Sequence, residues 1–277
     1  MLTGPLIPLL PALAIPPLPV PQPQQIGDRS DDEDSDGGAV DGPQIDGEVT
    51  LARTYVRRVP RHLEPLAAYI RQPRFPLLVR QFLYEQLHPD MELPESLDEL
   101  PDLSTTRFYT YNSARSIFHA PSDICGIGGM RREYIRATKS WFGGGARYDC
   151  VLVVHDRDAP GMQGMHVARV RLFFSFKTGG TLYPCALVHW FSLHGDEPDG
   201  DTGMWIVTPD WTHGNRGRQP ELVVIHVDTI LRAVHLMPVF GRATVPEENF
   251  DATDSLNAFE AFYVSKLADY HAHEIIY

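Results

Sequence analysis

The sequence predicts an α+β protein: an SH3-like/BAH-like (bromo-adjacent-homology-like) antiparallel β-barrel with an N-terminal helical segment and a C-terminal helix. Residues 148–240 contain five or six short strand patterns at regular spacing, which is typical of a small barrel. Thr178-Gly179-Gly180 lies between two long strand patterns and predicts a hairpin turn. Residues 63–87 and 255–274 instead carry apolar residues at helical spacing.

Residues 1–48 are expected to form a disordered, Pro-rich and acidic tail. Eight prolines occur by Pro23, and they prevent a continuous helix. The run DRSDDEDSDGG follows, which is too polar to order itself by burial. The tail holds nine acidic residues and one basic residue, Arg29, so it carries most of the formal net charge of −12. Because no Lys or Arg precedes Arg29, a signal peptide is not predicted, and we expect an intracellular, non-secreted protein.

Residues 49–106 are predicted to form a helical segment and an acidic connector. One helix is indicated by the spacing of Leu63, Leu66, Ala67 and Ile70. The second is expected to bury Leu78, Phe82 (or Leu83) and Leu87. His88-Pro89 should end it, because the residue before proline disfavours the helical conformation.

Residues 107–277 are predicted to form the β-barrel domain with its C-terminal helix. The long strand within residues 166–177 is expected to place Ala168, Val170, Leu172, Phe174 and Phe176 on one face. Residues 185–191 are apolar on both faces, so that strand should be covered on both sides. A helix over roughly 255–274 is expected to bury Leu256, Phe259, Tyr263, Leu267 and Tyr270.

Composition excludes several classes of protein. Three cysteines (Cys125, Cys150 and Cys185) are too few for a disulfide scaffold. Separately, no cofactor is expected. No apolar run reaches the roughly 20 residues that a bilayer span needs, so no membrane partner is expected. His155, Asp156, Asp158 and His166 could serve a metal-dependent nuclease, but spacing alone selects no three metal ligands.

Two groups of residues are candidates for binding. Aromatic grooves on small barrels can hold proline-rich or methylated-lysine peptides. The candidates for such a groove are Tyr183, Trp190, Trp205 and Trp211. Core packing is the competing interpretation of these four residues, and Trp211, in the predicted loop PDWTHGN, should be the most exposed tryptophan.

The second group is basic. Residues 53–80 hold one acidic residue, Glu64, and the seven arginines Arg53, Arg57, Arg58, Arg61, Arg71, Arg74 and Arg80. Direct contact with DNA is one interpretation of this run, and a solvated helix face or intramolecular docking is the other.

Several strings, taken in order, carry a resemblance to a known family. They are LARTYVRRVPRHLEPLAAYIRQPRFPLLVRQFLYEQLHPD, APSDICGIGGMRREYIRATKSW, RYDCVLVVHD, VARVRLFFSF, YPCALVHWF, DTGMWIV, VIHVDTILRAVHLMPV and FYVSKLADYHAHEI. Over roughly residues 49–277 the chain resembles the C-terminal region of proteins encoded by Plavaka-type DNA transposons of mushroom-forming fungi, in the Kyakuja–Dileera–Zisupton group. In such families a ribonuclease H-like core precedes this region and supplies metal-binding acids. Here the predicted tail precedes Val49, so no catalytic carboxylate is carried over to this chain.

The resemblance implies a transposon-derived, fungal and nuclear protein, either domesticated or truncated. Together with the barrel pattern it leads us to expect a non-catalytic module with a protein or chromatin partner, one that regulates or docks a transposase, rather than an enzyme. The alternatives are a DNA-binding accessory domain that uses the arginines of residues 53–80, a metal-dependent nuclease remnant, and a decayed fragment without function.

Overall fold

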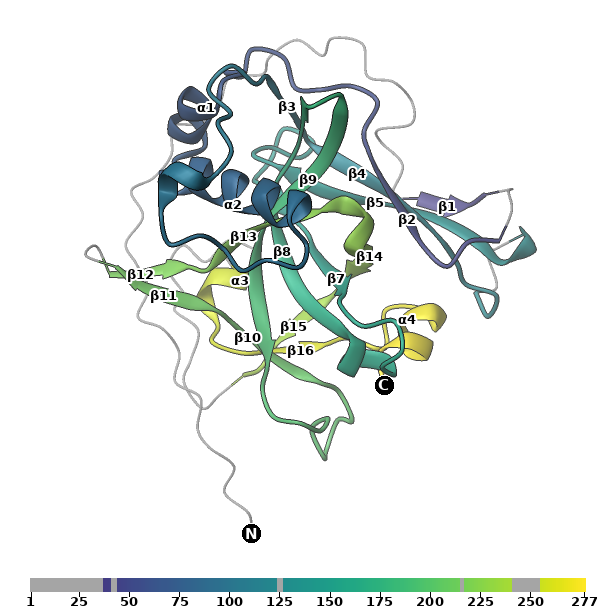
Figure 1. Ribbon diagram of the computed structural model, residues 1–277. Helices are drawn as coiled ribbons and strands as arrows, with labels where there is room; N and C mark the ends of the chain where they lie inside the picture. Colours follow the sequence, from purple (N-terminus) through teal and green to yellow (C-terminus); the bar gives the residue numbers. More distant parts are fainter. Residues whose placement is uncertain (1–36, 41–43, 124–126, 215–216, 241–254) are drawn as a thin grey trace.

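The computed structural model describes residues 37–40, 44–123, 127–214, 217–240 and 255–277 (Figure 1). Within these residues the protein is mainly β: a nearly closed antiparallel barrel of seven strands with a few short helices. The barrel strands follow the order β14 (Ile230–Val234), β7 (Cys150–Val154), β8 (Met165–Thr178), β9 (Thr181–Leu193), β10 (Ile206–Pro209), β16 (Phe262–Val264) and β15 (Leu236–Pro238). An antiparallel barrel with short helices is thereby confirmed.

The same sheet carries two further strands, and two smaller β elements complete the fold. β13 (Leu222–His226) pairs with β9, and β3 (Phe108–Tyr111) pairs with β8. A second sheet contains β1 (Gly37–Ala39), β5 (Met130–Thr138), β4 (Ser113–His119) and β2 (Glu48–Leu51), with β6 (Arg147–Tyr148) paired to β5. β11 (Trp211–Gly214) and β12 (Gly217–Pro220) form a separate two-stranded ribbon.

Helices are short and peripheral. They are α1 (Leu63–Ile70), α2 (Phe75–Leu87), α3 (Ser255–Ala258) and α4 (Tyr270–Ile275). Single 3₁₀ turns occur at Leu97–Glu99, Ile127–Gly129, Gly161–Gly164 and Val227–Thr229. The last of these turns lies between β13 and β14.

Three buried clusters hold these layers together. The helix cluster, which includes Leu66 and Phe75, packs α1 and α2 against β8, β9 and β13. The barrel cluster includes Phe191 and Phe262 and joins β7, β8 and β9 to β10 and β16. The intersheet cluster includes Ile135 and lies between the second sheet and the barrel strands. Strand β9 contributes to all three clusters, so the prediction that residues 185–191 are covered on both faces is confirmed.

The β8–β9 hairpin turns at the predicted position. Gly179 has a φ of 57° and Gly180 a φ of 85°. Both values lie in the left-handed region that a two-residue hairpin turn of type I′ requires, and glycine adopts it without a side-chain clash.

The predicted single face of β8 is wrong because the strand contains a bulge. The register with β9 shifts between Val170 and Leu172. Ala168 and Val170 therefore lie in the intersheet cluster, whereas Phe174 and Phe176 lie in the helix cluster. One extra residue in a strand moves every later side chain to the opposite face, and the alternation in sequence carries no mark of it.

The predicted helix over 255–274 is also wrong. The segment forms a four-residue helix, then strand β16, then α4. β16 pairs with both β10 and β15, which satisfies its backbone groups and outweighs helix propensity. Asp269 caps α4 by accepting a hydrogen bond from the Ala272 N–H at 2.7 Å. Leu267 and Tyr270, expected on a buried stripe, are exposed.

The helical segment largely follows its prediction. α1 buries Leu63, Leu66 and Ala67, and α2 ends at His88. Leu87 is 52% exposed, contrary to expectation, and its neighbours Glu85 and Gln86 in the last turn of α2 are exposed as well. Of the predicted tail, residues 1–36 and 41–43 lie outside the described residues, while β1 and the first residue of β2 fall within residues 1–48.

Removing the ring of Phe174 should strongly destabilise the fold. Phe174 is fully buried, and its ring lies 5.1 Å from that of Phe75 and 6.2 Å from that of Phe108. We expect Phe174→Ala to lower the free energy of unfolding by about 3–5 kcal/mol, because a cavity remains between helices and sheet. Leu182→Ala, at a side chain 59% exposed, is the control and should change it by less than about 0.5 kcal/mol. Equal effects in urea denaturation would contradict this packing.

Candidate functional site

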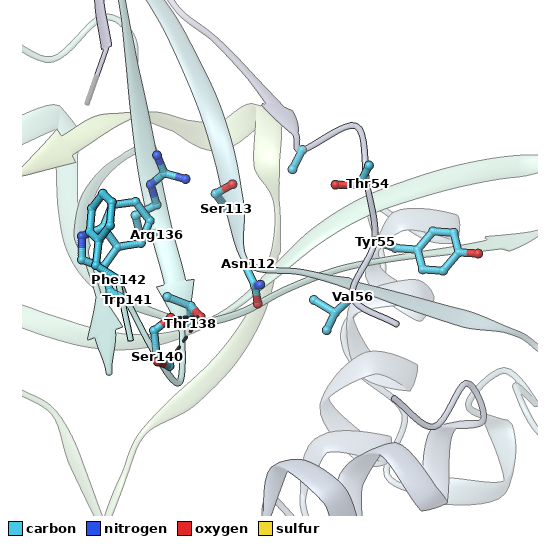
Figure 2. A pocket seen from close by; sticks show the side chains of 11 residues that line it. Thr54, Tyr55, Val56, Asn112, Ser113, Arg136, Thr138, Ser140, Trp141 and Phe142 are labelled. Carbon is cyan, nitrogen blue, oxygen red and sulfur yellow. Dashed lines mark hydrogen bonds between the residues drawn. The ribbon is translucent and has the colours of Figure 1, made fainter. Parts of the chain in front are cut away.

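A pocket of about 220 Å³ lies beside the second sheet (Figure 2). Three separate stretches of chain line it: the chain after β2, the link between β3 and β4, and the end of β5 with the loop that follows. We name it the polar pocket, after its polar side chains Thr54, Asn112, Ser113, Arg136, Thr138 and Ser140. Its aromatic residues are Tyr55, Trp141 and Phe142.

The polar pocket lies on the side of the second sheet that faces away from the barrel. Ser113 and Arg136 are directly paired across β4 and β5, so their side chains share one face. Ile135 and Ala137 alternate to the other face, where they are buried in the intersheet cluster. One face of β5 therefore packs against the barrel, and the side chains on its other face line the pocket.

The loop after β5 is held by hydrogen bonds within itself. Thr138 Oγ1 donates to the Ser140 carbonyl at 3.0 Å, and Ser140 Oγ donates to the Gly144 carbonyl at 3.1 Å. The Trp141 and Gly145 backbones are bonded at 3.0 Å. Phe142 has a φ of 50°, unusual for an aromatic residue. These bonds hold Trp141 and Phe142 at the pocket in an edge-to-face pair with centroids 4.5 Å apart.

Arg136 supplies a fixed positive charge in the pocket wall. Arg136 is 3% exposed. Its guanidinium carbon lies 4.8 Å from the ring centroid of Tyr134 and 4.3 Å from that of Trp141. Arg147 lies over the same indole at 5.1 Å. Asp149 binds the Arg147 Nε at 2.9 Å and the Arg136 backbone N–H at 2.8 Å. Stacked planar cations of this kind lose little side-chain freedom when they bind an anion.

The surroundings of the polar pocket are basic in sequence. No Asp or Glu occurs within two sequence positions of a lining residue. Five basic residues occur within that range: Arg53, Arg57, Arg58, Arg115 and Lys139. The predictions made from the sequence assign no site to residues 139–147. The one available signal was the Ser140-Trp141-Phe142 string beside three glycines, since two adjacent aromatic residues in a loop are seldom both core.

The four predicted aromatic residues do not line one groove. Trp205 is 4% exposed in the barrel cluster, and its indole N–H donates to the Tyr277 carbonyl at 3.2 Å. Tyr183 stacks on Phe176, and Trp190 is half-buried beside the intersheet cluster.

Trp211 begins strand β11 rather than lying in a loop, because residues 211–214 pair with residues 217–220. Its ring is half-buried between Arg218, at 4.6 Å, and His189, at 5.2 Å. Its indole is therefore in contact with neighbouring side chains, and the prediction that it lies in a loop is wrong.

The seven arginines divide into two sets. Arg80 donates to the carbonyls of Leu97, Leu100 and Pro101, which ties the connector to α2. The guanidinium of Arg61 lies 4.9 Å from the ring centroids of both Tyr55 and Tyr109. The exposed set comprises Arg53, Arg57, Arg58, Arg71 and Arg74. Three of these, Arg53, Arg57 and Arg58, belong to or directly follow the chain that lines the polar pocket.

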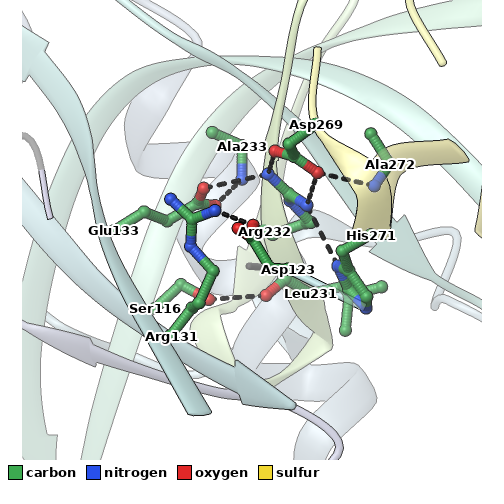
Figure 3. A network of polar contacts seen from close by, with 10 residues as sticks. All are labelled: Ser116, Asp123, Arg131, Glu133, Leu231, Arg232, Ala233, Asp269, His271 and Ala272. Atoms are coloured by element: carbon green, nitrogen blue, oxygen red, sulfur yellow. Dashed lines mark hydrogen bonds and ion pairs between the residues drawn. The ribbon is translucent and has the colours of Figure 1, made fainter. Parts of the chain in front are cut away.

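A partly buried polar network joins the second sheet to the barrel and to α4 (Figure 3). Arg232 binds Asp269 through two hydrogen bonds, of 2.9 and 2.5 Å, and Glu133 at 3.2 Å. Its guanidinium also lies 4.5 Å over the ring of Phe118. Burial alone would raise the pKa of Asp269, but the hydrogen bond and charge of Arg232 outweigh it and lower that pKa to about 2. We name these contacts the Arg232 network, and they are structural.

Two buried histidines are held in the neutral form. His271 Nδ1 lies 3.0 Å from Arg232 Nη1, and arginine only donates, so Nδ1 accepts and the proton is on Nε2. His189 Nε2 lies 2.7 Å from the Asp210 carbonyl and therefore carries the proton. Burial, reinforced by nearby arginines, lowers the pKa of each imidazole to about 4.

The remaining candidates for chemistry are dispersed. His155 and His166 stack with centroids 4.1 Å apart, but no three His, Cys, Asp or Glu side chains converge on a metal position anywhere in the described ranges. Cys150 and Cys185 are buried, and burial raises the pKa of both thiols, that of Cys150 to about 12. Cys125 lies outside the described residues.

Comparison with known proteins yields no match to a family model, to a curated protein or to a solved structure. In the part of the chain that the structure describes, no helix has the length and apolar character needed to span a bilayer. The site must therefore be interpreted from its own geometry.

Acid should destabilise the fold through the two buried histidines. The unfolded chain binds protons at imidazoles with a pKa near 6.5, whereas the folded chain resists protonation down to about 4. We therefore expect the free energy of unfolding to fall as the pH is lowered from about 6.5 to about 4. Urea denaturation at several pH values measures this dependence.

The double variant His189→Gln/His271→Gln should show a shallower pH dependence than the wild type, because its two amides do not titrate. His88→Gln, at an exposed histidine, is the matched control and should retain the wild-type slope. Identical slopes for all three proteins would contradict the assignment.

Breaking the Arg232 network should also be costly. We expect Asp269→Asn to lower the free energy of unfolding by about 3 kcal/mol, because Arg232 stays buried while losing a charged partner. Asp228→Asn removes a carboxylate that is 70% exposed and paired with His226, and it should change stability by less than about 1 kcal/mol. Thermal and urea denaturation of both variants provide the comparison.

Proposed function

We propose that this chain is a non-catalytic, transposon-derived interaction module that acts in the nucleus with chromatin or a transposase. We further propose that its barrel is of the SH3-like/BAH-like kind. The 3₁₀ turn at Val227–Thr229 between β13 and β14 supports the SH3-like assignment, since small barrels of this kind place a single helical turn before the closing strand.

The polar pocket is the observation that carries the proposal. It combines a buried, stacked cation, Arg136, with accessible hydroxyl and aromatic side chains. Such a surface recognises an anionic partner by charge and by planar contact. Chromatin offers anionic groups both in its DNA and in acidic protein surfaces.

Binding to reconstituted mononucleosomes tests the module. We expect the wild-type chain to bind, and Arg53→Glu/Lys139→Glu to weaken binding roughly 10-fold or more through charge repulsion at the pocket. Arg157→Glu/Arg218→Glu introduces the same charge change at exposed positions elsewhere and is the matched control. Absence of wild-type binding to mononucleosomes, or equal loss in both double variants, would contradict the proposed surface.

Direct DNA binding is the second candidate function, and the exposed set of arginines favours it. Affinity for duplex DNA should then fall steeply with salt, because each phosphate contact adds about −0.9 to the slope of log K against log salt concentration. We expect Arg57→Gln/Arg58→Gln to reduce that slope. If the chain binds no duplex DNA at about 50 mM salt, this second candidate function is contradicted.

A further inference from the structure

We propose that the polar pocket holds one nucleotide of a single-stranded nucleic acid, with its phosphate against Arg136 and its base against Phe142. This inference deepens the second candidate function and rests on it. It specifies that the nucleic acid is single-stranded and that Arg136 and Phe142 contact it. The exposed arginines alone specify neither.

The inner part of the pocket has the chemistry of a phosphate site. Ser113 is 4% exposed and lines the pocket. It lies beside Arg136 in the sheet register and between Arg136 and Thr54 in the view of Figure 2. The exposed amide of Asn112 comes from the same link. A guanidinium, a hydroxyl and an amide together provide the donors that phosphate oxygens accept.

The outer part offers a flat ring for a base. Phe142 is 57% exposed although it is a large apolar residue, and its edge-to-face contact with Trp141 holds the ring in place. Stacking on such a ring stabilises single-stranded nucleic acid without sequence preference, because every base has a π-face.

The pocket is too small to hold a base pair. Its volume of about 220 Å³ is below the roughly 300–1,000 Å³ of a pocket for a drug-sized ligand, so it takes the phosphate end of one nucleotide and leaves the base outside, against Phe142. A base inside a duplex is stacked on its neighbours and cannot reach Phe142 while its phosphate contacts Arg136. The strand must therefore be single-stranded or locally opened.

The charges around the pocket favour a strand over an isolated phosphorylated side chain. Arg53 lies within the lining segment, Arg57 and Arg58 follow it directly, and all three are exposed. These arginines can contact the phosphates of neighbouring nucleotides. A peptide with one phosphorylated side chain has no such additional phosphates. Asp149 is the nearby acid, and Arg147 binds it at 2.9 Å, which offsets its repulsion of a phosphate.

Fluorescence anisotropy with labelled oligothymidine of about 15 nucleotides tests the proposal on the full chain. We expect tighter binding to this strand than to a duplex of the same length. Phe142→Ala should weaken binding roughly 10-fold, and Ser113→Ala roughly 3-fold. Alanine meets the same backbone constraint at a φ of 50° as phenylalanine does, so the loss reports the ring. Circular dichroism and thermal melting verify that each variant is folded.

Leu182→Ala is the matched control, because it removes an equally exposed apolar side chain at the β8–β9 turn and should bind like the wild type. Thymidine monophosphate should compete, and thymidine should compete more weakly. Displacement by phosphotyrosine but not by the mononucleotide would overturn the assignment in favour of a phosphopeptide.

Two further outcomes separate this inference from the proposed function. If wild type and Phe142→Ala bind DNA equally while Arg57→Gln/Arg58→Gln weakens binding, the pocket assignment fails and DNA binding stands. If no nucleic acid binds the wild type, both the inference and the second candidate function fail.

Discussion

The burial of the Arg232 guanidinium is the constraint on which the rest of the structure depends. An ion in the protein interior loses its hydration, and this is tolerated only when fixed partners replace the water. Its partners are Glu133 from the second sheet and Asp269 at the start of α4, which lie 99 and 37 residues away. Sheet, barrel and C-terminal helix must therefore come together in one arrangement, and a register slip of β5 would take Glu133 away from the buried charge.

That constraint extends to the opposite face of β5. Glu133 and Arg136 are three residues apart on one strand, so their side chains point to opposite faces. Once Glu133 is fixed against the barrel, Tyr134, Arg136 and Thr138 are presented outward. The polar pocket is thus built on a strand whose position is set by the core, and only the loop that carries Trp141 and Phe142 depends on local hydrogen bonds.

Local chemistry was predictable from the sequence, and long-range pairing was not. The ends of α1 and α2 follow from apolar spacing and proline, and the Gly179-Gly180 turn follows from backbone freedom, because each is decided within a few residues. β16 forms only where β10 and β15 meet, and the bulge near Arg171 depends on the partner strand. The polar pocket joins stretches up to 90 positions apart, such as Ala52 and Phe142, so no sequence window contains it.

The same distinction explains why the aromatic residues predicted from the sequence to share a groove are dispersed in the structure. Trp205 is buried because the chain terminus reaches over it, and Tyr183 is covered by α2 through Phe82. The aromatic residues of the pocket loop, in contrast, are kept near solvent by a turn that bonds to itself. The pocket loop is held by its own hydrogen bonds, and the strand that carries it is anchored in the core. Such a surface loses little conformational entropy when it binds a ligand, so less of the free energy of its contacts is spent on ordering the site.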